Sequence, residues 1–185
     1  MDFQKVILDN YVTADEAQAL LGRTAALVAA ARGGGMAVIY VMVAFRRGYP
    51  EISAGNRVFA ALKDSGLFAR ESAKTDIHPA VAPVGDEPVV VKHRVGAFSG
   101  TDLETLLRAN GIGTLVLAGV TTSGVVLSTV RQAFDRDYEL VVAGDCCADP
   151  DGGVQEVLLG KVIAQHARVV ASAELVEALR AGHDG

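Results

Sequence analysis

The sequence contains no tryptophan and few cysteines or aromatic residues, and each shortage excludes a class of protein. Aromatic side chains make up 5% of the 185 residues, too few for a surface that stacks bases or sugars. The two cysteines are adjacent, at Cys146 and Cys147, and form no disulfide framework, so we expect a reduced, cytoplasmic protein. No secretory signal pattern opens the chain, and the longest apolar run, Met36 to Phe45, is too short to span a bilayer.

Positive charge is also scarce. The formal net charge is −5 and no run rich in Lys or Arg occurs, which argues against a nucleic-acid partner. Half of the residues are hydrophobic, enough for a core without disulfides or metal. We therefore expect one domain over residues 1–185, with a frayed tail at 181–185.

Apolar runs alternate with amphipathic stretches along most of the chain. The runs that predict buried strands are 36–45, 88–92, 114–120, 138–143 and 168–171, and the stretches that predict helices are 14–32, 56–64, 101–110, 124–135, 152–165 and 172–179. Thr13 and Glu16, and again Thr101 and Glu104, have the spacing of a capping box. Buried strands joined by helices require a mostly parallel sheet, here of five to six strands, with helices on both faces.

Ligands of such a sheet bind beyond the carboxyl ends of its strands, where several known motifs can be tested. Gly119 to Gly124 lies between a predicted strand and a helix, but Val125 and Val126 stand where a phosphate-binding loop needs Lys and Ser or Thr. Ser123 lacks the flanking glycines of a nucleophile elbow. The four histidines show no metal-ligand spacing, so we predict neither a metal nor a cofactor.

Three segments at predicted strand ends carry a resemblance to a known family. They are Met1-Asp-Phe-Gln4, Lys92-His-Arg-Val-Gly-Ala-Phe98 and Gly119-Val-Thr-Thr-Ser-Gly124. In this order they resemble the isochorismatase-like hydrolases, a superfamily of cysteine amidases, such as nicotinamidases, and of isochorismate-cleaving enzymes. The resemblance covers nearly the whole chain, including Phe45 to Glu51 and Gly144 to Asp149. It implies a three-layer Rossmann-like α/β fold, a small-molecule substrate and a homodimer or homotetramer.

The resemblance also implies a catalytic triad of Asp, Lys and Cys. Asp2 and Lys92 match the first two members. The turn that would supply the oxyanion donors, with a cis peptide bond at Val120-Thr121, comprises Val120, Thr121, Thr122, Ser123 and Gly124.

The nucleophile position of that triad holds Val125. Valine has no lone pair, so a thioester route to amide hydrolysis is closed. Branches of the family that cleave isochorismate also lack the Cys, and there the Asp is thought to protonate the enol-ether carbon before water completes the reaction. We therefore predict a hydrolase that uses Asp2 and Lys92 for acid–base chemistry, with an isochorismate-type enol ether as model substrate. The alternatives are an inactive relative that keeps its pocket for binding or assembly, and an amidase with a relocated cysteine.

Other residues compete for a role in the site. Asp9 closes the apolar run Val6-Ile-Leu and is a second candidate for the strand-end carboxylate. Arg46 and Arg47 could clamp a substrate carboxylate. Further candidates are Cys146, Cys147, Ser123 or Thr122 as replacement nucleophiles, and Phe3, Phe45, Tyr49 and Phe98 as pocket walls.

One expectation concerns the first strand. If Asp2 ends a central strand beside 114–120, the apolar residues of that strand should precede it, yet the sequence starts at Met1. A missing central strand leaves backbone N–H and C=O groups unpaired in the core. We therefore expect either that Met1 lies at the edge of a gap or that Val6 to Leu8 fills it.

Overall fold

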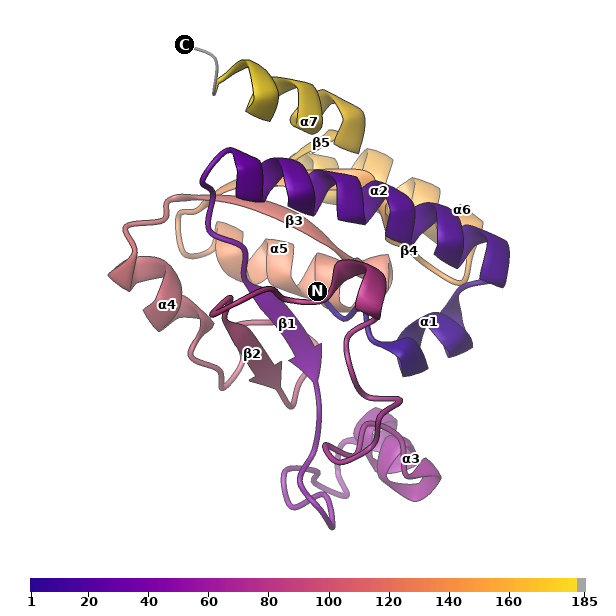
Figure 1. Cartoon of the computed structure of the whole chain (residues 1–185). Coiled ribbons are helices and arrows are strands. Elements are labelled where there is room, and N and C mark those ends of the chain that lie inside the picture. The colour runs from indigo at the N-terminus through magenta and orange to yellow at the C-terminus, as the bar shows by residue number, and fades with distance from the viewer. Residues whose placement is uncertain (183–185) are drawn as a thin grey trace.

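The computed structural model describes residues 1–182 and shows helices alternating with strands (Figure 1). The helices are α1 (Lys5–Tyr11), α2 (Ala14–Gly33), α3 (Arg57–Ser65), α4 (Leu103–Ala109), α5 (Leu127–Phe134), α6 (Gly152–Val157) and α7 (Ser172–Ala181). The strands are β1 (Tyr40–Val43), β2 (Val89–Lys92), β3 (Thr114–Val120), β4 (Glu139–Ala148) and β5 (Arg168–Val170). Of the expected frayed tail at 181–185, Ala181 ends α7 and residues 183–185 lie outside the described part.

All strand pairs are parallel, but they form two sheets instead of one. One sheet has the order β1-β2 and the other the order β3-β4-β5. The predicted α/β class is confirmed, whereas the prediction of a single sheet of five to six strands is wrong. The reason is that β1 and β3 are not hydrogen-bonded to each other and the short segment Met1–Asp2 lies between them.

Helices cover both faces of the larger sheet, as predicted (Figure 1). On one face, α2 and α7 pack through Leu27 and Leu175 near Ala118 of β3. On the other face, α4 and α5 pack through Leu107 and Val130. The loop that follows β1 and helix α3 lie beyond the arrowheads of β1 and β2, at the carboxyl ends of these strands (Figure 1).

Several helices and strands begin or end at other residues than the sequence predicted. The run Met36 to Phe45 is a strand only over Tyr40–Val43, because only this part pairs with β2. The predicted strand 138–143 is longer, Glu139–Ala148. The helix expected at 124–135 starts with one π-helical turn, and the one expected at 152–165 continues from α6 through a π turn and a 3₁₀ turn.

The two predicted capping boxes had opposite outcomes. The Thr13–Glu16 box forms: the Thr13 hydroxyl accepts from the Glu16 N–H and the Glu16 carboxylate accepts from the Thr13 N–H. The box predicted at Thr101 is wrong, because the Thr101 hydroxyl donates to Ala97 O and Glu104 pairs with Arg136 instead.

Met1 and Asp2 bridge the two sheets. The amino group of Met1 donates to Ala118 O at 2.8 Å, and its carbonyl accepts from the Val120 N–H at 3.2 Å. On the other side, the Asp2 N–H donates to Val41 O at 2.8 Å. The first of our two expectations is therefore confirmed, with Met1 at the edge of a gap. Val6 to Leu8 does not fill it, because these residues lie in α1.

The side chain of Gln4 replaces a strand partner for β1. It is fully buried, and its carboxamide accepts from the Val43 N–H at 2.8 Å and donates to Val43 O at 2.9 Å. It also donates to Thr75 O at 2.6 Å, which fixes the long loop that follows α3. A side-chain amide thus satisfies backbone groups that a neighbouring strand would otherwise bind.

We expect Gln4→Leu to lower the free energy of unfolding by about 3 kcal/mol, because it leaves the backbone groups of Val43 and Thr75 buried without partners. Chemical denaturation measures this change. The control is Gln165→Leu at an exposed position, which should stay within about 0.5 kcal/mol of the starting protein. Equal effects of the two substitutions would contradict the account.

Candidate active site

The predicted pair Asp2 and Lys92 meets in the structure. Lys92 is the last residue of β2, and Asp2 follows the residue that bridges the sheets. Lys92 Nζ lies 2.8 Å from Asp2 Oδ2, and the two residues are only 3% and 4% exposed. Lys92 Nζ also donates to Arg94 O at 3.2 Å. The end of β2 and the amino-terminal segment thus bring an amino group and a carboxyl group into contact away from bulk water.

Burial controls the protonation of Asp2. Desolvation raises its pKa above the usual range, while the charge and hydrogen bond of Lys92 act in the opposite direction. Oδ1, the second carboxyl oxygen, has no hydrogen-bond partner within residues 1–182. A carboxyl group with a raised pKa and one unengaged oxygen is suited to carry a proton and to deliver it to a substrate.

The turn after β3 follows Lys92 in the sequence, in the order that the resemblance implies. It begins at Val120, whose N–H donates to the carbonyl of Met1, the residue before Asp2. The Val120-Thr121 peptide bond is cis, and Thr122–Val126 forms the π-helical turn. Thr121 O accepts from the N–H groups of Gly124 and Val126. The Ser123 N–H donates to Asp149 Oδ2 at 2.7 Å, a carboxylate that the sequence analysis did not single out.

Val125 is buried in this turn, with 2% of its surface exposed. Its aliphatic side chain can neither attack a carbonyl carbon nor leave from one. Thr122 is fully buried, and its Oγ1 has no hydrogen-bond partner in the described part of the chain. Thr122 therefore adds an unengaged hydroxyl to the turn, in addition to the unengaged carboxyl oxygen of Asp2.

A cluster of charged residues lies on the loops after β1 and β2, and the sequence analysis singled out only Arg46 among them. Glu51 Oε1 lies 2.6 Å from Arg46 Nη1 and 3.5 Å from His93 Nε2, and Glu51 O accepts from Arg94. Burial opposes ionisation of Glu51, but hydrogen bonds from its own backbone and from Arg46 outweigh it and lower the Glu51 pKa. Both Arg46 and Arg47 are exposed, and Arg46 pairs with Glu51.

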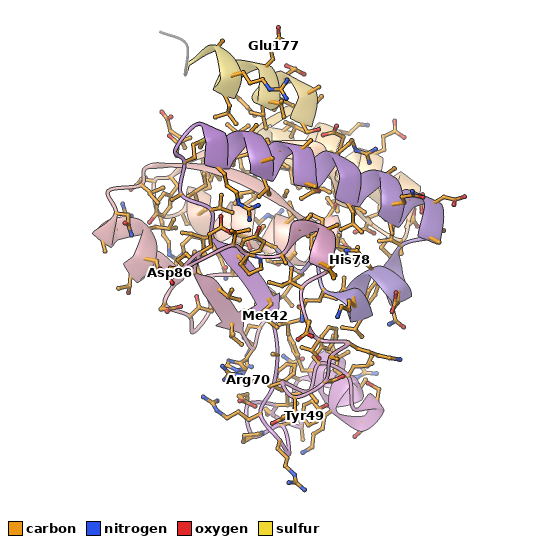
Figure 2. All side chains as sticks on the ribbon, in the orientation of Figure 1. Met42, Tyr49, Arg70, His78, Asp86 and Glu177 are labelled. Atoms are coloured by element: carbon orange, nitrogen blue, oxygen red, sulfur yellow. The ribbon has the colours of Figure 1, made fainter. Side chains whose placement is uncertain are left out.

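The four aromatic residues predicted as pocket walls lie in different places. Phe3 and Phe45 are buried in the core cluster around α1. Phe45 contacts Tyr49 and His93, with ring centroids 5.7 and 5.8 Å apart. Tyr49 lies on the α3 side of the molecule, below Met42 of β1 (Figure 2). Phe98 packs against Tyr138 in the other core cluster.

The competing carboxylate, Asp9, lies elsewhere. It is exposed on α1 and does not end a strand. The structure therefore places Asp2, and not Asp9, beside Lys92.

Both cysteines are free and buried at the end of β4. Burial raises the pKa of the Cys146 thiol, and it raises that of Cys147 to about 12. A thiolate is the reactive form of cysteine, so neither residue is activated as a nucleophile.

Residues 1–182 hold no group of three or more His, Cys, Asp or Glu side chains placed to bind a metal ion. Over the same residues, no helix has the length and apolar character that crossing a membrane requires.

Comparison with known sequences points to one family. The family model described as "Isochorismatase domain" matches residues 1–174. The isochorismatase family protein YecD of Escherichia coli O157:H7 is 34% identical over 173 residues, which cover 90% of this chain and 85% of YecD. Maleamate amidohydrolase of Pseudomonas putida is 28% identical over 165 residues, covering 88% of this chain and 75% of that protein.

Comparison with solved structures gives the same fold. A cysteine hydrolase from Pseudomonas syringae pv. phaseolicola superposes with a TM-score of 0.87 at 24% identity, covering 97% of this chain and 90% of that one. An isochorismatase family protein from Desulfovibrio vulgaris gives a TM-score of 0.83 at 27% identity, with coverages of 97% and 95%.

We expect both thiols of the folded protein to resist alkylation. Iodoacetamide near pH 7.5 should modify Cys146 and Cys147 at least about 10²-fold more slowly than in urea, because the native thiols are buried and protonated. Intact-mass spectrometry over time measures both rates. Rapid native modification of one thiol, accompanied by loss of hydrolytic activity, would instead favour a relocated cysteine nucleophile.

Proposed function

The chain belongs to the isochorismatase family of hydrolases, and from this premise we propose that it hydrolyses a small molecule by acid–base catalysis with Asp2 and Lys92. The proposed reaction forms no covalent enzyme intermediate. An enol ether of the isochorismate type is the model substrate. The observation that carries the proposal is the buried contact of 2.8 Å between Lys92 Nζ and Asp2 Oδ2, together with the raised pKa of Asp2.

The chemistry proceeds in two steps. The protonated carboxyl group of Asp2 gives its proton to the terminal carbon of the enol ether, and the remaining positive charge is shared by the adjacent carbon and the ether oxygen. Water then adds to that carbon and loses a proton, and the resulting hemiketal breaks its C–O bond to give a ketone and an alcohol. The carboxylate of Asp2 recovers a proton, so the enzyme is unchanged over the cycle.

Lys92 has a defined task in this scheme. Once Asp2 has released its proton, a carboxylate is left in a site nearly closed to water, where an unpaired charge is strongly disfavoured. The ammonium group of Lys92 at 2.8 Å stabilises this charge as it forms. The same ammonium keeps the pKa of Asp2 from rising further, so that the acid remains able to release its proton.

Val125 supports the choice of a route without a thioester. The similar proteins maleamate amidohydrolase and N-carbamoylsarcosine amidase are, by their names, enzymes that hydrolyse amide bonds. In this chain the position that the resemblance assigns to the nucleophile is a buried valine, and the two cysteines are buried thiols with raised pKa values. Both observations favour the proton-transfer route over an amidase.

We expect Asp2→Asn to lower turnover of an enol-ether panel on the order of 10²- to 10⁴-fold, because the amide has no acidic proton to give. Ketone release measures the rate. The matched control is Asp9→Asn on the exposed face of α1, which should leave the rate unchanged. Unchanged turnover in Asp2→Asn would exclude acid catalysis by this residue, and absence of turnover in the unmodified protein on the whole panel would favour the inactive relative.

The pH profile tests the same proposal in a variant that keeps the carboxyl group. Turnover needs protonated Asp2, so it should be highest on the acid side and fall as the pH rises through the raised pKa of Asp2. Lys92→Gln removes the charge that lowers this pKa, so the fall should shift to higher pH. If turnover falls at the same pH in Lys92→Gln as in the unmodified protein, Lys92 does not act on the protonation of Asp2.

Replacing Val125 tests the position assigned to the nucleophile. We expect Val125→Cys to gain measurable amidase activity on small amides, because it restores a thiol at the position that the resemblance assigns to the nucleophile. The control is Val126→Cys, an equally conservative change at the next buried residue. If both new thiols behave alike, Val125 does not occupy the nucleophile position.

A further inference from the structure

Positively charged side chains gather beside the candidate acid–base pair, on the loops that follow β1 and β2. Arg46 belongs to the loop after β1, and His93 and Arg94 come directly after Lys92. Because Val43 of β1 pairs with Lys92 in a parallel register, the two loops leave the sheet at the same edge. They therefore bring these side chains to the edge at which Lys92 lies.

Arg70 is the third arginine of this group. Its backbone N–H donates to Phe45 O at 3.0 Å, which places it next to the end of β1 (Figure 2). Burial lowers the pKa of His93, and the charges of Arg46, Arg94 and Arg70 lower it further. All three guanidinium groups thus lie close enough to act on the same imidazole. We call Arg46, Arg70 and Arg94 the arginine cluster.

The arginine cluster has one carboxylate partner for its three charges. Glu51 Oε1 lies 2.6 Å from Arg46 Nη1 and balances the charge of Arg46. The side chain of Arg94 donates to two backbone carbonyls, those of Glu51 and His93. Within residues 1–182, neither Arg94 nor Arg70 forms an ion pair. Two guanidinium groups can therefore take an anion from outside the chain.

Glu51 holds part of the arginine cluster in place. Its hydrogen bonds outweigh burial and lower its pKa, so it is a carboxylate at neutral pH. Its side chain fixes Arg46, and its backbone carbonyl accepts from Arg94 at 3.2 Å. An arginine that is already ordered loses less conformational entropy when it binds a ligand.

Arg94 also links the arginine cluster to the candidate acid. Its backbone carbonyl accepts from Lys92 Nζ at 3.2 Å, and the same ammonium lies 2.8 Å from Asp2 Oδ2. An anion bound by the side chain of Arg94 is therefore next to the segment that positions Lys92. One small molecule can reach both places.

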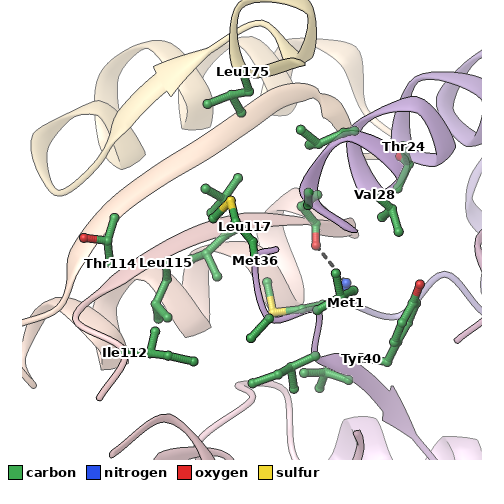
Figure 3. Close-up of a pocket in the computed structure, with 18 of the residues that line it drawn as sticks. Met1, Thr24, Val28, Met36, Tyr40, Ile112, Thr114, Leu115, Leu117 and Leu175 are labelled. Carbon is green, nitrogen blue, oxygen red and sulfur yellow. Dashed lines mark hydrogen bonds between the residues drawn. The ribbon is translucent and has the colours of Figure 1, made fainter. Parts of the chain in front are cut away.

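The arginine cluster lies apart from the apolar cavity between the two sheets. That cavity has a volume of about 360 Å³ and is lined by Leu115 and Leu117 of β3 and by Tyr40 of β1 (Figure 3). None of the three arginines lines it. An anion held by the cluster thus binds on the loops beyond the strands.

We propose that Arg94 and Arg70 bind a carboxylate of the substrate, so that the enzyme acts on enol ethers that are organic acids and discriminates against their neutral esters. This inference rests on the proposed function, because it describes how the substrate of that reaction is held. The planar guanidinium group matches the two oxygens of a carboxylate, and such hydrogen bonds are strengthened by charge. The bound carboxylate would orient the enol-ether carbon toward Asp2.

The test measures binding without turnover. The probe is 2-cyclohexyloxypropanoate, the saturated analogue of an enol ether, which has no double bond to protonate. NMR titration of the folded protein should show that its methyl ester binds at least about 10-fold more weakly than the acid, because the ester has no charge. Arg94→Gln and Arg70→Gln should each weaken binding of the acid about 10-fold and leave binding of the ester unchanged.

The matched control is Arg180→Gln, an equal change of net charge at an exposed position on α7, at the opposite end of the molecule from α3 (Figure 1). It should bind the acid as the unmodified protein does. Arg70→Gln keeps the test decisive if Arg94→Gln fails to fold, because the side chain of Arg70 is exposed.

Two results would overturn the inference. In the first, the acid binds no more tightly than its ester. In the second, Arg70→Gln weakens binding no more than Arg180→Gln does, so that only net charge matters. Binding that prefers the acid and depends on Arg70, in a protein that turns over no enol ether, would support the carboxylate site and contradict only the proposed reaction.

Discussion

The side chains of Asp2 and Lys92 meet at 2.8 Å in a place nearly closed to water, and this contact joins the amino-terminal segment to the last residue of β2. A charge on either group without the other nearby would lose its hydration without compensation. The pair therefore constrains the backbone around it. Asp2 has a φ of 60°, a conformation that few residues other than glycine adopt, and it is held there by the bond from its N–H to Val41 O.

The same segment connects the chemistry to the interrupted sheet. Met1 is bound to β3 and Asp2 to β1, so the two residues span the sheets at the point where the candidate acid lies. On one side of Met1 is an apolar cavity lined by Leu115 and Leu117 of β3 and by Tyr40 of β1, and on the other is the acid–base pair. The position of the acid thus depends on backbone hydrogen bonds across the gap, and Gln4 extends these contacts to Val43 with its side chain.

Apolar periodicity is a local signal, and it predicted the five strands and the helices from α2 onward in their order. It did not predict α1, and the Asp2–Lys92 pair was implied by the resemblance to the family. Nor did it predict that the run Met36 to Phe45 would be a strand only over Tyr40–Val43, since strand length depends on a partner elsewhere in the chain. The capping box at Thr101 failed because distant Arg136 binds Glu104. Glu51 and Asp149 were missed for the same reason: their partners, Arg46, His93 and Ser123, are brought to them by loops whose course is set by packing.

The account depends on Asp2 holding its proton in conditions where an ordinary aspartate has lost it. The most direct measurement is a ¹³C NMR titration of the Asp2 side-chain carboxyl in the folded protein. The account predicts a midpoint above the usual value of 3.8, because burial outweighs the opposing effect of Lys92. A midpoint at or below 3.8 would show that Lys92 dominates and keeps Asp2 ionised, and it would contradict a role for Asp2 as the acid.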